Sequence, residues 1–314
     1  MSSGRHTTTY KHFNRQIRRV ALFCERIPFP GWKPLTLYDV ISLFVKGLTK
    51  GSLNIRATSI AFHFMLALGP AMIFTLALIP YLPIQNLQEN LMEILFDVIP
   101  EDSYIALESL LDSIFTVRHG LQIFGFLLTL FFVQKGINGI IEAFNASYHT
   151  VESRPWIERR LVSLALFAIL FILVIFSVML LFFSKLGTEY LYEAGKIEDT
   201  ANQLLIITGK WLVISTLTLF AISFLFYLAP ARKTQWRFFS PGAVFGACSS
   251  IITSIAFSSF VNHFAPLHEF YGSIGTLIGI MLWMNFNAIA LLAGFELNAS
   301  IHIARFQMNE PNAL

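Results

Sequence analysis

The chain has 314 residues, of which 55% are hydrophobic and 13% charged, with a formal net charge of +3 and a mean hydropathy of +0.63. This composition excludes a water-soluble globular domain, because there is too little polar surface to cover one, so lipid must cover much of the chain. The apolar runs do not alternate with polar residues, as the strands of a membrane barrel would. The sequence therefore predicts an all-α, polytopic membrane protein.

Residues 1–50 form a basic segment that we expect to lie in the cytoplasm. Its first part has an apolar stripe opposite a row of Lys and Arg: Phe13, Ile17, Val20, Cys24 and Ile27. This pattern predicts a helix lying on the anionic cytoplasmic leaflet, with membrane lipids as its partners. A basic run can instead bind nucleic acid, but no nucleic-acid partner is expected beside a membrane domain. A linker rich in proline precedes a second short helix, predicted over residues 35–48.

Residues 51–301 form the membrane domain, in which six stretches are long enough to cross about 30 Å of hydrocarbon at 1.5 Å per residue. They are residues 57–82, 120–148, 161–184, 204–229, 241–262 and 271–300. The second stretch is the least apolar, because polar residues follow Leu121–Val133. A short cytoplasmic tail, residues 302–314, is expected after the last span.

The distribution of basic residues predicts the orientation. With both termini inside, the cytoplasmic segments hold seventeen Lys and Arg, and the outer loops hold only Arg118, Lys185 and Lys196. Lys and Arg concentrate on the cytoplasmic side of membrane proteins, so an N-in, C-in arrangement with an even number of spans is expected. The first outer loop, about residues 83–119, is acidic and has the spacing of two short amphipathic helices that break at Pro100.

Small residues recur in the fifth and sixth predicted spans. They are Gly242, Gly246, Ser250, Ser254 and Ser258, and then Gly272, Gly275 and Gly279. Small residues four positions apart share a helix face and let a second helix approach closely. We therefore expect these two spans to be tightly packed antiparallel neighbours, with a structural role for the small residues.

Seven polar side chains fall at similar depth in the cytoplasmic half of three predicted spans. They are His63, Lys135, Asn138, Glu142, Asn145, Glu296 and Asn298. Because an unpaired charge in the membrane is costly, Lys135 is expected to pair with Glu142 or Glu296. The cluster is either a structural ion pair that fixes helix register or a polar vestibule open to the cytoplasm. For Asn285 and Asn287, interhelical hydrogen bonds and a role in a pathway are both open.

Several short motifs together resemble one family. They are Ala61–Leu66 with Pro70, Ala143–Tyr148 with Arg154–Trp156, Tyr227–Pro230 with Trp236 and Arg237, Tyr271–Gly275, and Gly294–Ala299. As a set they resemble the YihY/virulence factor BrkB family of bacterial inner-membrane proteins, from about Lys46 to Ile301. His63 departs from the Tyr that the family usually has. The resemblance implies a six-helix inner-membrane protein without a settled activity, although some members have carried a ribonuclease BN label.

Three functions remain in view. A ribonuclease would need clustered Asp, Glu or His to hold metal ions near RNA, and no such motif is present, so neither catalysis nor a cofactor is expected. The second function is transport or handling of a lipid or small amphipathic solute. The chain has no G-x-x-x-x-G-K-[ST] loop, so transport would use an ion gradient, be passive, or depend on another subunit. The third is a scaffold or regulator that transports nothing.

Overall fold

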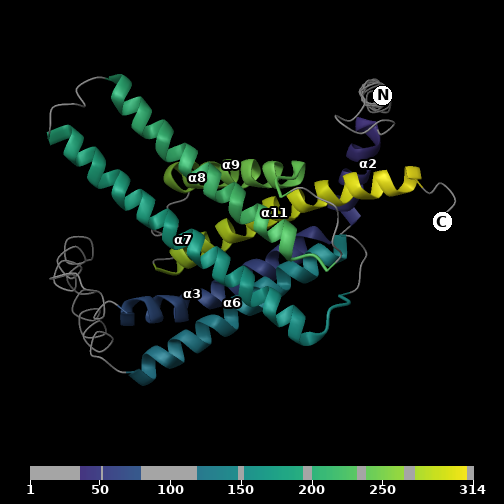
Figure 1. Ribbon diagram of the computed structural model, residues 1–314, viewed down its shortest axis with the longest axis horizontal. Coiled ribbons are helices and arrows are strands. Elements are labelled where there is room, and N and C mark those ends of the chain that lie inside the picture. The colour runs from purple at the N-terminus through teal and green to yellow at the C-terminus, as the bar shows by residue number, and fades with distance from the viewer. Residues whose placement is uncertain are drawn as a thin grey trace, which may run out of the picture.

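The computed structural model describes residues 36–50, 52–78, 119–147, 152–193, 200–231, 238–264 and 273–309. This part of the chain consists mainly of helices (Figure 1). The helices are α2 Leu37–Lys50, α3 Leu53–Leu78, α6 His119–Ser147, α7 Trp156–Glu193, α8 Thr200–Leu228, α9 Pro241–Phe264 and α11 Ser273–Asn309. The all-α prediction is confirmed for these residues, and α2 is the short helix predicted before the first span.

A helix occupies each of the six predicted spans, and five contain segments long and apolar enough to cross a membrane. These segments are Ile123–Ser147, Trp156–Ser177, Ile206–Leu228, Pro241–Val261 and Leu277–Arg305. Helix α3 is not among these five segments, and the span predicted for it continues past Leu78, where the described range ends. The described residues therefore contain five candidate spans by length and composition.

Two helices are longer than predicted. Helix α7 continues to Glu193, and α11 continues through the predicted tail to Asn309. The extension of α11 has a packing partner, because Ile301 and Ala304 form a small buried cluster with Val40 of α2. Burial of this apolar stripe stabilises the extra turns, so α11 stays helical past residue 302, where the tail is predicted to begin.

Successive helices run in opposite directions. Two hydrogen bonds join the start of one helix to the end of another: Arg56 to Ala143, and Arg154 to Ala229. A third joins Gly242 at the start of α9 to Asn298 in the second half of α11. The starts of α3 and α7 therefore lie beside the ends of α6 and α8, and the start of α9 lies beside the second half of α11. We call this end of the bundle the arginine end, because Arg56, Arg154 and Arg159 lie there. In Figure 1 it is on the right, beside α2.

The core lies where α6, α8 and α11 meet. Phe144 and Phe295 stack with ring centroids 3.9 Å apart, and Phe226 meets both rings edge-on. Stacked and edge-to-face contacts are the favoured arrangements of aromatic rings, and each contributes about 0.5–1.5 kcal/mol beyond area burial. These three rings fix the relative positions of the three helices.

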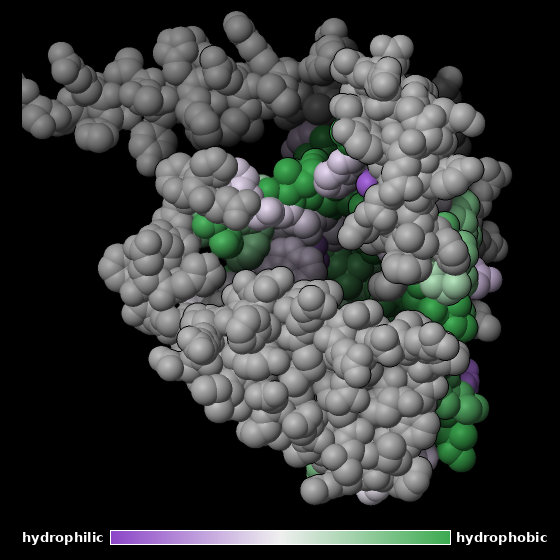
Figure 2. Space-filling view, turned by 90° about the vertical axis from the view of Figure 1, so that its left-hand side faces the viewer, coloured by the Kyte–Doolittle hydropathy of each residue, from purple (hydrophilic) through white to green (hydrophobic). Residues whose placement is uncertain are grey.

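Much of the remaining surface is apolar. Helix α7 alone exposes Phe171, Ile172, Val174 and Phe176. Figure 2 views the molecule from the end opposite the arginine end, where the visible described residues are mostly hydrophobic. A soluble monomer rarely exposes apolar area on this scale, so these helix faces are suited to lipid.

Helices α9 and α11 are antiparallel and touch backbone to backbone. A Cβ added at Gly294 would lie 2.7 Å from the carbonyl oxygen of Gly242 and 2.7 Å from Cα of Gly246. The contact forms through Gly242 and Gly246, but not through Gly279, where an added Cβ would meet nothing within 4 Å. The closest approach therefore lies at Gly294, further along α11 than the glycines that the sequence analysis named. Gly275 is buried, and Gly272 lies outside the described residues.

Two predicted elements cannot be compared with the structure. The amphipathic helix near residues 13–27 and the helices of the loop at about residues 83–119 lie outside the described ranges.

Candidate functional site

An ion pair crosses the arginine end between α3 and α11. Arg56 Nη2 lies 3.9 Å from Glu296 Oε2, and the two side chains are only 12% and 8% exposed. Arg56 Nη1 also donates to the carbonyl of Ala143 at 2.6 Å and to the hydroxyl of Ser147 at 3.0 Å. A single guanidinium therefore links three helices, which suits its planar set of donors.

Helix α2 closes over the Glu296 carboxylate. Gly47 faces this carboxylate so closely that an added Cβ would overlap it. Among the described residues, neither Arg56 Nε nor Glu296 Oε2 has a hydrogen-bond partner, although both atoms are buried. Glycine at position 47 lets α2 cover a charged group that would otherwise lie at the surface of α11.

A second ion pair lies in the connection between α6 and α7. Arg154 contacts Glu152 through two nitrogen atoms, with Nε–Oε1 2.7 Å and Nη2–Oε2 2.9 Å. Arg154 Nη2 also donates to the carbonyl of Ala229 at 2.8 Å, and Asn145 joins Glu152 to the backbone N–H of Ala231. This network attaches the α6–α7 connection to the end of α8, and we call it the Arg154 network.

The hydrogen bonds from Arg154 hold the pKa of Glu152 below its ordinary value of 4.5, against a smaller opposing effect of burial. The ion pair is therefore at full strength above the unfolded-state value and is lost as the pH falls through the lower folded-state value. Between pH 6 and pH 3, the melting temperature of the wild type in detergent should fall more than that of Glu152→Gln. Parallel curves for the two proteins would contradict this linkage.

Two further clusters lie at the same end. Arg159 at the start of α7 binds Glu142 and Asn138 of α6, and Asn138 also accepts a hydrogen bond from Ser163. At the start of α9, Ser240 caps the helix by accepting from the N–H of Ala243 at 3.2 Å. Asn298 of α11 binds both the Ser240 hydroxyl and the N–H of Gly242, and is itself buried.

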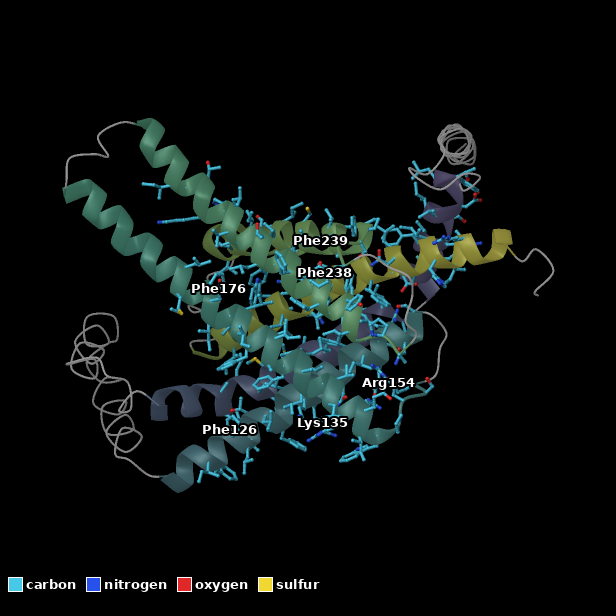
Figure 3. All side chains as sticks on the ribbon, in the orientation of Figure 1. Phe126, Lys135, Arg154, Phe176, Phe238 and Phe239 are labelled. Atoms are coloured by element: carbon cyan, nitrogen blue, oxygen red, sulfur yellow. The ribbon has the colours of Figure 1, made fainter. Side chains whose placement is uncertain are left out.

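The polar residues predicted to meet as one cluster are divided between these contacts. The pairing of Lys135 with Glu142 or Glu296 is wrong, since Glu142 pairs with Arg159 and Glu296 with Arg56. Lys135 is exposed, with Nζ 5.6 Å from the ring centroid of Phe131, and Figure 3 shows it at the periphery of the bundle. His63 contacts the carbonyl of Ser59 within its own helix at 2.7 Å.

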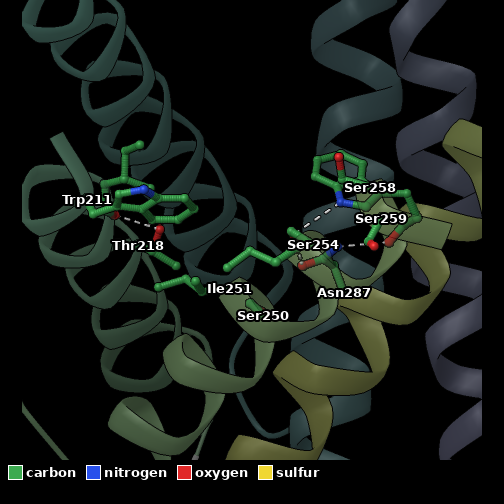
Figure 4. Close-up of a pocket in the computed structure, with 11 residues that line it drawn as sticks. Trp211, Thr218, Ser250, Ile251, Ser254, Ser258, Ser259 and Asn287 are labelled. Carbon is green, nitrogen blue, oxygen red and sulfur yellow. Dashed lines mark hydrogen bonds between the residues drawn. The ribbon is translucent and has the colours of Figure 1, made fainter. Parts of the chain in front are cut away.

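A groove lies between α8, α9 and α11, away from the arginine end (Figure 4). It has a volume of about 720 Å³ and is open on one side. Trp211 and Thr218 line it from α8, and Ser250 and Ser254 line it from α9. We call it the tryptophan groove, because Trp283 of α11 faces it as well.

One wall of the tryptophan groove is tied together by side-chain hydrogen bonds. Trp283 Nε1 donates to Ser254 Oγ at 3.1 Å, and Ser254 donates to Asn287 Oδ1 at 3.3 Å. Asn285, on the neighbouring face of α11, donates to Thr58 of α3 at 2.8 Å. Asn285 and Asn287 therefore both form interhelical hydrogen bonds, which the sequence analysis gave as one of two roles for them.

Comparison with known proteins gives the family. The model described as virulence factor BrkB matches residues 44–313. The chain is 30% identical over 250 residues to the putative ribonuclease-like protein YfkH of Bacillus subtilis, covering 79% of this chain and 89% of that protein. It is 22% identical over 274 residues to the UPF0761 membrane protein IL2447 of Idiomarina loihiensis, covering 87% and 94%. No solved structure matches it.

The chain belongs to the virulence factor BrkB family. Together with its apolar helices, this makes it a membrane protein related to the UPF0761 proteins. "Ribonuclease-like" is part of the name of the Bacillus subtilis relative. In the part of this BrkB-family protein that the structure describes, no three His, Cys, Asp or Glu side chains are placed to hold a metal ion.

Three of the motifs that carried the resemblance contribute residues to the arginine end: Ala143–Tyr148 with Arg154–Trp156, Tyr227–Pro230, and Gly294–Ala299. Asn145, Arg154 and Ala229 belong to the Arg154 network. Gly294 and Asn298 contact α9, whereas Glu296 contacts α2 and α3. The sequence analysis missed Arg56 as a site residue, because it counted only as one cytoplasmic charge. It also missed Trp211 and Trp283, since aromatic residues are frequent in this chain and their spacing carries no separate signal.

Proposed function

We propose that this BrkB-family protein binds and handles a lipid or small amphipathic solute in the tryptophan groove. The observation that carries the proposal is an open groove lined by both polar and aromatic side chains at membrane depth. Polar side chains within spans usually face a partner helix or a cavity that serves a ligand. A groove of about 720 Å³ is within the usual range for small-molecule sites.

The depth of the groove supports an amphipathic occupant. Trp211 lies seven residues inside the predicted span 204–229 and Thr218 lies fourteen inside, which is about 10 and 21 Å at 1.5 Å per residue. The lining thus extends from the outer part of a 30 Å hydrocarbon layer to its middle. A lipid could place its polar head among the serines and leave its chains in the bilayer, since the groove is open on one side.

Filling the groove should test this function. Ser254→Trp places a bulky ring in the groove, whereas the matched variant Ile252→Trp places it on an exposed face of the same helix. Native mass spectrometry of gently purified protein should find a co-purified amphipathic molecule with the wild type and Ile252→Trp, but at most one tenth as much with Ser254→Trp. Equal retention by both variants would contradict the proposal, and no retention by the wild type would favour a scaffold.

We also propose six spans in the bacterial cytoplasmic membrane, with both termini inside and residues 1–50 on the anionic leaflet. The alternating helix directions support this, because the start of α3 and the end of α11 both lie at the arginine end, with α2 beside α11. The charge asymmetry then places the arginine end in the cytoplasm.

Thiol labelling should establish the orientation. In a background lacking Cys24 and Cys248, cysteines at Asp102 and Glu193 should react with an impermeant reagent added to whole cells. A cysteine at Arg232 should react only after the membrane is permeabilised. The reverse pattern would place the tryptophan groove in the inner half of the membrane.

A further inference from the structure

The tryptophan groove presents hydrogen-bonding groups but no charge. Its polar lining consists of the hydroxyls of serine and threonine, the amide of Asn287 and the two indole N–H groups. No Lys, Arg, Asp or Glu lines it among the described residues. Lys210 precedes Trp211 in the chain but is not part of the lining.

This lining is unsuited to a charged headgroup. A phosphate or ammonium group at this depth would lose its hydration, and the cost is several kcal/mol unless an opposite charge compensates for it. The ion pairs of Arg56, Arg154 and Arg159 lie at the arginine end, away from the groove. An uncharged headgroup avoids this cost.

The groove offers hydrogen bonds to such a headgroup. Ser254 and Asn287 are already bonded to each other and to Trp283. By contrast, Ser250 and Ser258 make no side-chain hydrogen bond within the described part of the chain. In Figure 4, Trp211 stands on α8 across the groove from Ser254 and Ser258. A hydroxyl-rich ring between these walls would meet serine hydroxyls on one side and the indole of Trp211 on the other.

We propose that the occupant of the tryptophan groove is a glycerolipid with an uncharged, hydroxyl-rich headgroup, such as a monoglycosyl diacylglycerol. The C–H groups of a sugar ring carry partial positive charge and pack against the negative face of an indole. Its hydroxyls both donate and accept, as serine hydroxyls do. This inference rests on the proposed function, because it specifies the class of lipid that the same groove takes.

A lipid titration separates the two proposals. Delipidated full-length protein in detergent would be titrated with four lipids that have the same acyl chains: monoglucosyl diacylglycerol, diacylglycerol, phosphatidylglycerol and phosphatidylcholine. Binding would be measured by native mass spectrometry. The glucosyl lipid should bind at least tenfold more tightly than any of the other three. Diacylglycerol controls for chain binding, and phosphatidylglycerol supplies hydroxyls together with a charge.

Variants test whether the selectivity arises in the groove. Ser250→Ala with Ser258→Ala should reduce the preference for the glucosyl lipid about fivefold without changing the melting temperature, because these hydroxyls have no other described partner. Trp211→Leu should reduce it further, whereas Ile252→Leu on the exposed face should not.

The outcomes are distinct. Tighter or equal binding of a phospholipid, still blocked by Ser254→Trp, would overturn the uncharged headgroup and leave the proposed function standing. No binding of any of the four lipids above that of Ser254→Trp would overturn both. A preference for the glucosyl lipid that survives the serine and Trp211 variants would also overturn the assignment to this groove.

Discussion

Gly294→Ala should be among the most damaging single-methyl substitutions in this protein. The added Cβ would lie 2.7 Å from both the Gly242 carbonyl oxygen and the Gly246 Cα, which are backbone atoms and cannot rotate away. Helices α9 and α11 would have to separate, and overpacking of this kind typically costs about 1–3 kcal/mol. We expect a value near 3 kcal/mol, measured as a lower melting temperature in detergent and increased proteolysis.

A second glycine in the same helix provides the control. At Gly279 an added Cβ would meet nothing within 4 Å. Gly279→Ala should therefore be neutral or stabilising by up to about 1 kcal/mol, because alanine is the better helix former. If Gly294→Ala and Gly279→Ala had the same melting temperature, the contact of α9 with α11 would not depend on close approach at Gly294.

The second large effect is expected for Arg56→Met. It removes hydrogen bonds to Ala143 and Ser147 and leaves Glu296, 8% exposed, without its cation. Breaking a buried pair by deleting one partner costs roughly 3–5 kcal/mol, chiefly because the remaining charge is stranded. Thermal unfolding in detergent should show a loss of this size, and Arg56→Lys should recover only part because lysine lacks the planar fork.

The double variant Arg56→Met with Glu296→Met separates the two causes. When both charges are replaced by apolar groups of similar size, the cost is often small. We therefore expect the double variant to regain at least half of the stability lost in the single variant. A double variant as unstable as Arg56→Met would assign the loss to the hydrogen bonds with α6.

The helices could be predicted because the thickness of hydrocarbon imposes a length that is visible in the sequence. The contacts at the arginine end could not be predicted from the sequence. The position of Gly47 against Glu296 depends on α2 and α11 being neighbours, although some 250 residues separate them in the chain. No local pattern encodes that adjacency, so Gly47 carried no signal. The same applies to the tryptophan groove, which requires the relative positions of three helices.

The error at Lys135 has a geometric cause. Lys135, Asn138, Glu142 and Asn145 do share one side of α6, within an arc of roughly 80° at 3.6 residues per turn. One edge of an arc of that width can face away from the bundle while the other edge faces into it. Lys135 and Glu142 lie on the exposed edge and Asn145 on the buried one, so sharing a face did not mean sharing a partner. Glu142 instead forms its ion pair with Arg159 of α7.

The concentration of ion pairs at one end of the bundle has a mechanical consequence. Arg56, Arg154 and Arg159 fasten the helices where α2 lies, whereas Figure 1 shows the far ends of α7 and α8 well apart from those of α3 and α6. Motion of α8 would therefore be a rotation about the fastened end. Over its 29 residues, a rotation of only 5° moves the free tip by about 4 Å. Trp211 lies 17 residues from Leu228, so the same rotation moves this wall of the tryptophan groove by about 2 Å without breaking any of these ion pairs.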